Sequence, residues 1–132
     1  MLTTTDLHVE LAAEAGIVRA LDGLALSIDR GETFALVGES GCGKSMTALA
    51  LMRLLPDNGA VTAGSVKLHG EELLTLPERS MRAVRGKRIA MIFQEPATSL
   101  NPVLRVGDQI LETIVTHTPL RGQEARARAI DW

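Results

Sequence analysis

The 132-residue sequence is poor in aromatic residues and in cysteine, and both shortages exclude classes of function. It contains two Phe, one Trp and no Tyr, whereas a module that stacks nucleic-acid bases needs aromatic faces. The single cysteine, Cys42, cannot form an internal disulfide, and together with three scattered His it does not have the ligand spacing of a zinc site. The composition therefore argues against base-stacking, zinc-binding and disulfide-stapled domains.

An excess of charge of one sign and a long hydrophobic run are also missing. Fourteen basic and sixteen acidic residues give a net charge of −2, whereas a chain that binds phosphate backbones is usually clearly basic. The first residues lack the basic and apolar regions of a signal peptide, and the most apolar stretch, 47–55, is about half the length that spans a bilayer. We expect a globular, cytoplasmic domain whose link to any membrane comes through a partner.

Hydrophobic periodicity predicts an alternation of strands and helices. Alternating apolar and polar residues predict strands over 7–11 and 24–28, and a short exposed strand followed by a turn over 65–70. Continuous apolar runs predict strands buried on both faces over 33–37 and 89–93. Helical spacing with start and stop signals predicts helices over 44–55, 77–85, 106–117 and 123–132. The first of these helices is apolar nearly all round, so we expect it to be largely buried.

A glycine-rich segment between a predicted strand and a predicted helix fits the phosphate-loop pattern G-x-x-x-x-G-K-S/T. Its glycines let successive N–H groups point at phosphate oxygens, and the following helix adds its positive N-terminal end. Lys44 would reach the β- and γ-phosphates, and the Ser45 hydroxyl would bind Mg²⁺. The candidate nucleotide-binding residues are Gly38, Glu39, Ser40, Gly41, Cys42, Gly43, Lys44 and Ser45. The alternative is a glycine-rich turn without a ligand.

A phosphate loop alone does not choose among kinases, GTPases, motors and transporters. Hydrolysis also needs a group that binds Mg²⁺ and one that positions the attacking water. The apolar run 89–93 is followed by Gln94, which can orient a water or coordinate Mg²⁺ through its carbonyl oxygen. Gln94 is therefore a candidate catalytic residue and, with Ser45, a candidate Mg²⁺ ligand. The alternative is a strand-end residue that bonds a backbone group.

The phosphate loop and Gln94 together resemble the ATP-binding subunits of ABC transporters, in the oligopeptide, dipeptide and glutathione importer branch. The resemblance begins near Leu7 and is carried by segments 37–45, 48–55, 91–96 and 99–102. It implies an α/β fold in which an incomplete P-loop NTPase core joins an antiparallel β-subdomain and the start of a helical subdomain. The implied parts are the β-subdomain over about 1–31 and 61–75, the core over about 32–60 and 86–97, and the helical subdomain over about 104–132.

The resemblance also implies an activity and partners. ATP and Mg²⁺ would bind at the phosphate loop, and in the complete subunit ATP hydrolysis would drive import of peptides, glutathione or nickel. Gln94 would contact Mg²⁺ and the attacking water, beside the groove where a membrane partner docks. The implied partners are transmembrane permease subunits, a second ATP-binding subunit and, indirectly, a substrate-binding protein, with no nucleic acid. The implied location is the cytoplasmic face of the plasma membrane.

The sequence departs from the family pattern in two respects. Residues 1–33 contain no aromatic side chain to stack on adenine, so Ile17 or Val18 would provide apolar contact instead. Downstream of Gln94 there is no LSGGQ signature, no Walker B strand ending in Asp and Glu, and no switch histidine, since His117 has the setting of a surface residue. We therefore expect an N-terminal portion of a longer subunit that exposes apolar edges and binds nucleotide weakly without hydrolysing it.

Two other interpretations stay open. The chain could be a non-enzymatic nucleotide-binding or interaction fragment that competes for the membrane partner. The chain could also be a small P-loop kinase or GTPase, although the sequence shows neither the Mg²⁺-binding acid nor the base-recognition motif that such an enzyme needs. Five cations in residues 79–88 favour a solvated helix face over a nucleic-acid or lipid-binding patch.

Overall fold

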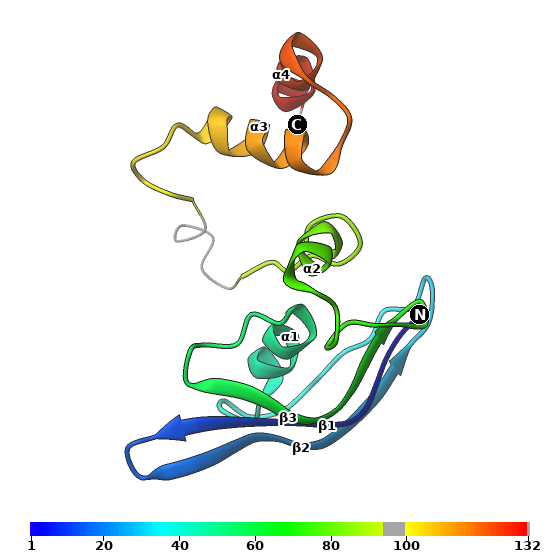
Figure 1. The fold of residues 1–132 in the computed structure, drawn as a ribbon, viewed down its shortest axis with the longest axis vertical. Coiled ribbons are helices and arrows are strands. Elements are labelled where there is room, and N and C mark those ends of the chain that lie inside the picture. Colours follow the sequence, from blue (N-terminus) through cyan, green and yellow to red (C-terminus); the bar gives the residue numbers. More distant parts are fainter. Residues whose placement is uncertain (94–99, 132) are drawn as a thin grey trace. The chain divides into compact units, whose positions relative to one another are not determined.

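The computed structural model describes residues 1–93 and 100–131. The chain divides into two compact units, Met1–Met81 and Arg82–Trp132. The first unit contains a four-stranded sheet and helix α1 (Lys44–Met52). Helix α2 (Glu78–Val84) spans the division, and the second unit contains α3 (Val106–His117) and α4 (Gly122–Asp131) (Figure 1).

The sheet is antiparallel throughout and follows the order β2-β1-β3-β4. Its strands are β1 (Leu2–Ala13), β2 (Gly16–Ile28), β3 (Gly59–Leu68) and β4 (Glu71–Glu72). The strands predicted over 7–11 and 24–28 are confirmed as parts of longer strands. The strand and turn predicted over 65–70 are confirmed as well, since β3 ends at Leu68 and a turn follows it. The expected mixture of helices with an antiparallel sheet is confirmed as well.

Helix α1 lies over the sheet, and together they form the core of the first unit (Figure 1). The buried apolar side chains of this unit come from three strands, from α1, from the segment that leads into α2 and from the first turn of α2 itself. They are Leu7, Val9, Leu21, Ala50, Met52, Val66, Leu68, Leu73 and Met81. Each buried Leu, Val or Met side chain contributes about 1.5–3 kcal/mol when it leaves water, so this core stabilises the sheet that lies beneath the phosphate loop.

Helix α1 ends three residues before the predicted boundary. Arg53 adopts a left-handed conformation (φ 52°), and its N–H donates to the Ala50 carbonyl. The N–H of Leu54 donates to the Leu49 carbonyl, which completes a Schellman ending with Arg in the place usually taken by Gly. The Arg53 guanidinium donates to the carbonyls of Leu73 and Leu76, at 3.2 and 2.6 Å. These two bonds compensate for the unfavourable backbone and tie the end of α1 to the segment before α2.

The two helices of the second unit lie where the sequence predicts them, but the burial of one residue, His117, differs from the prediction. Val106–His117 is helical over the predicted range, and α4 begins one residue earlier than expected. Ile114 and Ala125 are buried and belong to the packed pair α3 and α4. His117, expected at the surface, is half-buried against Gly86, where an added Cβ would lie 2.7 Å from the imidazole Nε2.

The two strands predicted over 33–37 and 89–93 are wrong for this structure. No described residue pairs with 33–37, and the second segment makes only an isolated bridge between Arg85 and Ile89. Val37 is 89% exposed and Ile92 is 94% exposed. A strand buried on both faces needs neighbouring strands and two covering layers. Apolar composition predicts that a segment can be buried, but it does not supply the neighbours that bury it.

Glu72 of β4 stabilises the junction between β3 and the turn that leads to α2. Its carboxylate accepts hydrogen bonds from the Ser65 hydroxyl and from the backbone N–H groups of Val66 and Leu74. Burial on its own would raise the pKa of Glu72, but these bonds, with the nearby Lys67 charge, lower it below its ordinary value. Folding therefore stabilises the ionised form of Glu72 relative to its protonated form.

The lowered pKa of Glu72 predicts a pH-dependent contribution to stability. Because the folded pKa lies below the unfolded one, the stabilisation is present above about pH 4.5, the ordinary glutamate pKa, and is lost as pH falls through the folded pKa. We expect Glu72→Gln to lower the free energy of unfolding by about 1–3 kcal/mol near neutral pH. Denaturant unfolding at several pH values should show the deficit shrinking toward acid pH; a deficit independent of pH would contradict this account.

Candidate functional site

The phosphate-loop residues form an exposed turn that ends at the first residue of α1. Gly41 and Gly43 have φ values of 85° and 90°, a left-handed conformation that disfavours residues with a Cβ. The Cys42 N–H donates to the Glu39 carbonyl at 3.4 Å, which closes the turn. The first helical bond follows, from the Thr47 N–H to the Gly43 carbonyl at 2.7 Å.

Lys44 bends back over its own loop. Its ammonium donates to the carbonyls of Gly38 at 2.8 Å and Glu39 at 2.5 Å, and lies 3.4 Å from the Cys42 sulfur. The positive charge is thereby held over the mouth of the loop by neutral acceptors. No carboxylate takes part in these bonds, so an anion that enters the loop meets an ammonium that is not already neutralised.

The loop offers backbone donors as well. Among the described residues, the N–H groups of Ser40, Gly41 and Gly43 donate to no acceptor. The first turn of α1 leaves further N–H groups without helical partners, carries no acidic residue, and its N-cap makes no side-chain hydrogen bond. Free N–H groups, the positive end of a helix dipole and a lysine thus converge on one small region. This donor set fits a phosphate group.

Gly43 is seated directly against β2. A Cβ built on Gly43 would lie 2.6 Å from the Ala20 carbonyl oxygen, closer than real Cβ atoms approach, and 3.0 Å from the Leu21 side chain, a very tight contact. Leu21 is buried and pairs with Val9 of β1, so the loop lies against a paired strand. The sheet therefore determines where the loop lies, which the sequence pattern did not indicate.

The other predicted residues are only partly described. Ser45 and Cys42 are exposed at the start of α1, and Cys42 is a free thiol. Gln94 lies outside the described residues, so its predicted contacts with Mg²⁺ and water stay predictions. Ile17 and Val18, the expected adenine contacts, are 70% and 52% exposed near the β1–β2 turn. No group of three or more His, Cys, Asp or Glu in the described part of the chain could hold a metal ion.

The sequence did not indicate that Gln109 holds a neighbouring loop segment in place. From α3 its amide donates to the carbonyls of Asn101 at 3.1 Å and Leu104 at 3.2 Å, and it accepts from the Asn101 N–H at 2.8 Å. These bonds attach the segment 100–104 to α3. The same residues border an open groove of about 430 Å³ in the second unit. Gln109 is eight residues from Asn101, so no local pattern could have paired them.

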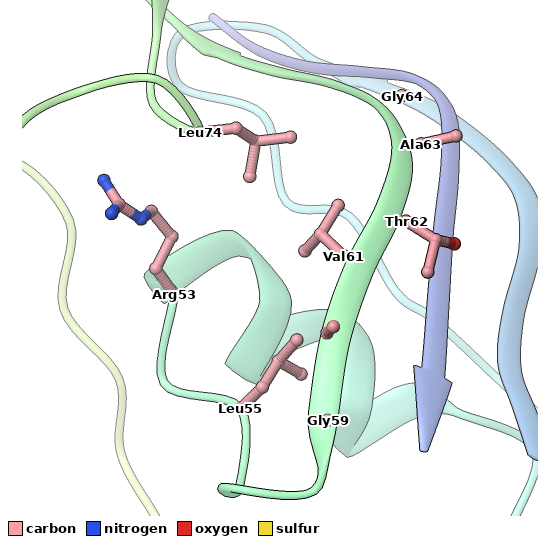
Figure 2. Close-up of a pocket in the computed structure, with 9 residues that line it drawn as sticks. Arg53, Leu55, Gly59, Val61, Thr62, Ala63, Gly64 and Leu74 are labelled. Atoms are coloured by element: carbon pink, nitrogen blue, oxygen red, sulfur yellow. The ribbon is translucent and has the colours of Figure 1, made fainter. Parts of the chain in front are cut away.

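A second groove, of about 490 Å³, lies in the first unit at the opposite end of α1 from the phosphate loop. Arg53 and Leu55 face Val61 of β3 and Leu74 across it (Figure 2). The length of α1, nine residues, separates this groove from the loop by about 13 Å. It is therefore distinct from the candidate phosphate-binding loop.

Comparison with known proteins identifies the family. A family model described as "ABC transporter" matches residues 21–132. The probable D,D-dipeptide transport ATP-binding protein DdpD of Escherichia coli (strain K12) is 48% identical over 132 residues, which cover 99% of this chain and 40% of that protein. The oligopeptide transport ATP-binding protein OppD of Salmonella typhimurium is 46% identical over 125 residues, 95% of this chain and 37% of that protein. The chain thus spans about two fifths of the length of these relatives.

The fold also resembles solved structures. The dimeric post-hydrolysis state of the ATP-binding cassette MJ0796, bound to ADP and Pi, matches with a TM-score of 0.84 at 23% identity. The match covers 99% of this chain and 55% of that one. None of the helices described here has both the length and the apolarity that crossing a bilayer requires.

The contact between Gly43 and β2 predicts a difference between two glycines of the same loop. Gly41→Ala should cost about 1–2 kcal/mol of unfolding free energy, because only the left-handed backbone opposes it and nothing lies within 4 Å of the added Cβ. Gly43→Ala should cost about 1–3 kcal/mol more, because its Cβ also meets the Ala20 carbonyl. Urea unfolding of both variants measures this difference. Equal losses of unfolding free energy would show that Gly43 does not lie against β2.

Proposed function

Since this chain belongs to the ABC transporter family, we propose that residues 38–45 bind the triphosphate of ATP together with Mg²⁺. The single observation that carries the proposal is the loop geometry: Lys44 held by neutral carbonyls above N–H groups that have no acceptor. Support also comes from the matched family and from the relatives described as transport ATP-binding proteins.

The loop residues have separate roles in this proposal. The N–H groups of Ser40, Gly41 and Gly43 donate to phosphate oxygens. The Lys44 ammonium leaves the carbonyls of Gly38 and Glu39 for the more strongly accepting β- and γ-phosphates. The Ser45 hydroxyl and the Gln94 side-chain carbonyl would provide oxygen ligands to Mg²⁺. Mg²⁺ supplies charge neutralisation at the phosphates. Gln94 also orients the attacking water in the complete subunit.

The biological role proposed for the complete subunit is ATP-driven import of peptides or of a similarly handled cargo, glutathione or nickel. Its partners are transmembrane permease subunits, a second ATP-binding subunit and, through the permease, a substrate-binding protein. The subunit would act at the cytoplasmic face of the membrane as a peripheral component. In this proposal the β-subdomain occupies about 1–31 and 61–75, the P-loop core about 32–60 and 86–97, and the helical subdomain begins near residue 104.

Replacing Lys44 tests the nucleotide site. Lys44→Ala removes the ammonium that would bond two phosphates, so we expect its dissociation constant for ATP with Mg²⁺ to rise at least tenfold, for a charge-assisted bond of about 1.5–3 kcal/mol. Isothermal titration calorimetry gives the constants directly. Lys87→Ala is the matched control, because it removes an exposed lysine of the other unit and should leave the affinity unchanged. Equal affinities for all three proteins would refute the proposal.

Turnover is a separate expectation for the 132-residue polypeptide. The sequence carries no LSGGQ segment and no Asp-Glu pair at the end of an apolar strand after Gln94, so no acid is provided at the γ-phosphate. We expect phosphate release from ATP at the background rate of buffer. A release rate well above background that disappears in Lys44→Ala would contradict this expectation while supporting the binding site.

A further inference from the structure

Arg53, at the end of α1, binds two carbonyl groups that are distant in the chain. Its Nη1 atom donates to the carbonyl oxygens of Leu73 at 3.2 Å and of Leu76 at 2.6 Å. Its Nη2 atom lies 4.0 Å from a carboxylate oxygen of Glu78, the first residue of α2. The Arg53 side chain is 26% exposed, so these bonds are partly shielded from water. Arg53, Leu73 and Leu76 are called the arginine clamp below.

The turn that accepts these hydrogen bonds is itself attached to the sheet. The Leu73 side chain is fully buried, and its N–H donates to the Val66 carbonyl of β3 at 2.8 Å. The Leu76 N–H donates to the Leu73 carbonyl at 3.4 Å, so the two clamped carbonyls belong to one turn. The Leu74 N–H donates to the Glu72 carboxylate of β4 at 3.1 Å. The arginine clamp therefore joins the end of α1 to a turn that the sheet holds in place.

The backbone of Arg53 indicates that its side chain has a role. Its φ of 52° and ψ of 46° are left-handed, a conformation that costs free energy for a residue with a Cβ. Glycine usually occupies this position at a helix end, at a lower cost but without a guanidinium. Unfavourable backbone conformations persist where surrounding contacts determine them, and they are frequent at sites of function. The conformation thus points to the arginine clamp as the feature that requires arginine here.

Helix α1 needs a second point of attachment besides the contact at its first end. There, Gly43 lies against the Ala20 carbonyl of β2, a contact that prevents closer approach but not a tilt away from the strand. The buried residues of α1 are Thr47, Ala50 and Met52, and two of these have small side chains. The arginine clamp at the opposite end provides the second point, and two points fix the direction of the helix axis.

A small tilt of α1 would matter at the loop. Lys44 is the first residue of this nine-residue helix, so it lies about 13 Å from the clamped end. A tilt of about 5° around that end would move Lys44 by about 1 Å. Donor–acceptor distances of hydrogen bonds vary over only about 0.5 Å. Loss of the clamp would therefore disturb the match between the loop donors and a phosphate group.

We propose that Arg53 is a positioning residue for the phosphate loop: its guanidinium clamp fixes the far end of α1 and thereby the place of Lys44 and of the loop N–H groups. In its consequence for affinity, this role rests on the proposed nucleotide site. None of the clamp residues belongs to the loop itself. ATP with Mg²⁺ therefore binds more tightly to a chain in which the clamp is intact.

Arg53→Gly is the direct test, because it removes the guanidinium and supplies the residue that a left-handed helix end prefers. In NMR spectra of the full chain without nucleotide, the backbone amide signals of residues 38–44 should shift relative to the unchanged protein. About 13 Å separates the substituted residue from Lys44, so such shifts report a movement of α1 rather than a direct effect of the lost side chain. Unshifted signals at 38–44 would overturn the positioning role.

Two further variants separate the clamp from a loss of charge. Arg30→Gly is the matched control, since it makes the same change of residue and of net charge in an exposed turn of the same unit. It should leave the signals of 38–44 and the affinity for ATP unchanged. Arg53→Asn also tolerates the left-handed backbone, and its short side chain replaces the guanidinium, so it should reproduce the shifts of Arg53→Gly. Loop shifts as large in Arg30→Gly, or none in Arg53→Asn, would contradict the clamp.

Titration calorimetry with ATP and Mg²⁺ distinguishes this role from the proposed function. The dissociation constant should be about two- to thirtyfold higher for Arg53→Gly than for the unchanged protein, the range over which residues remote from a ligand modulate its binding. If Lys44→Ala weakens binding while Arg53→Gly binds as tightly as the unchanged protein, the positioning role fails and the nucleotide site survives. If Lys44→Ala also binds as tightly, the nucleotide site fails, and the amide signals without nucleotide decide the role of Arg53.

Discussion

The contact between Gly43 and the backbone of β2 is the constraint on which the site depends. It brings the end of the glycine-rich loop so close to the Ala20 carbonyl that no Cβ fits between them. The loop is therefore supported from below by a paired strand with Leu21 and Val9 buried beneath it. From above, Lys44 spans the loop through two carbonyls. The free N–H groups are thus presented by a framework that has little freedom to collapse, which is the preorganisation that anion binding requires.

Much of this site could be predicted from the sequence, because its pattern is local. Gly41, Gly43, Lys44 and Ser45 lie within five consecutive residues, and backbone conformation and helix capping act over that range. The helix over 106–117 was predictable for the same reason, since a regular apolar spacing repeats within it. The contacts that position the loop were not predictable. They join Gly43 to Ala20 and Leu21, which lie in β2, far from the loop in the sequence.

The two apolar runs mark where local reasoning fails. Residues 33–37 and 89–93 have the composition of buried strands, yet in this structure their side chains are largely exposed. Apolar side chains favour burial, but the free energy of burial is gained only when neighbouring strands are present to cover them. Arg53 shows the opposite case: a residue unsuited to a left-handed position adopts it, because distant carbonyls of Leu73 and Leu76 accept its hydrogen bonds. In both cases tertiary contacts decide the outcome.

The central claim is that a triphosphate binds on the loop seated against β2. The most direct measurement follows backbone amide chemical shifts by NMR during titration of the full chain with ATP and Mg²⁺. The account predicts that the largest shifts occur at residues 38–46, with smaller ones at Ala20 and Leu21 beneath Gly43. Shifts that cluster instead around the groove beside Arg53, with the loop unaffected, would contradict it.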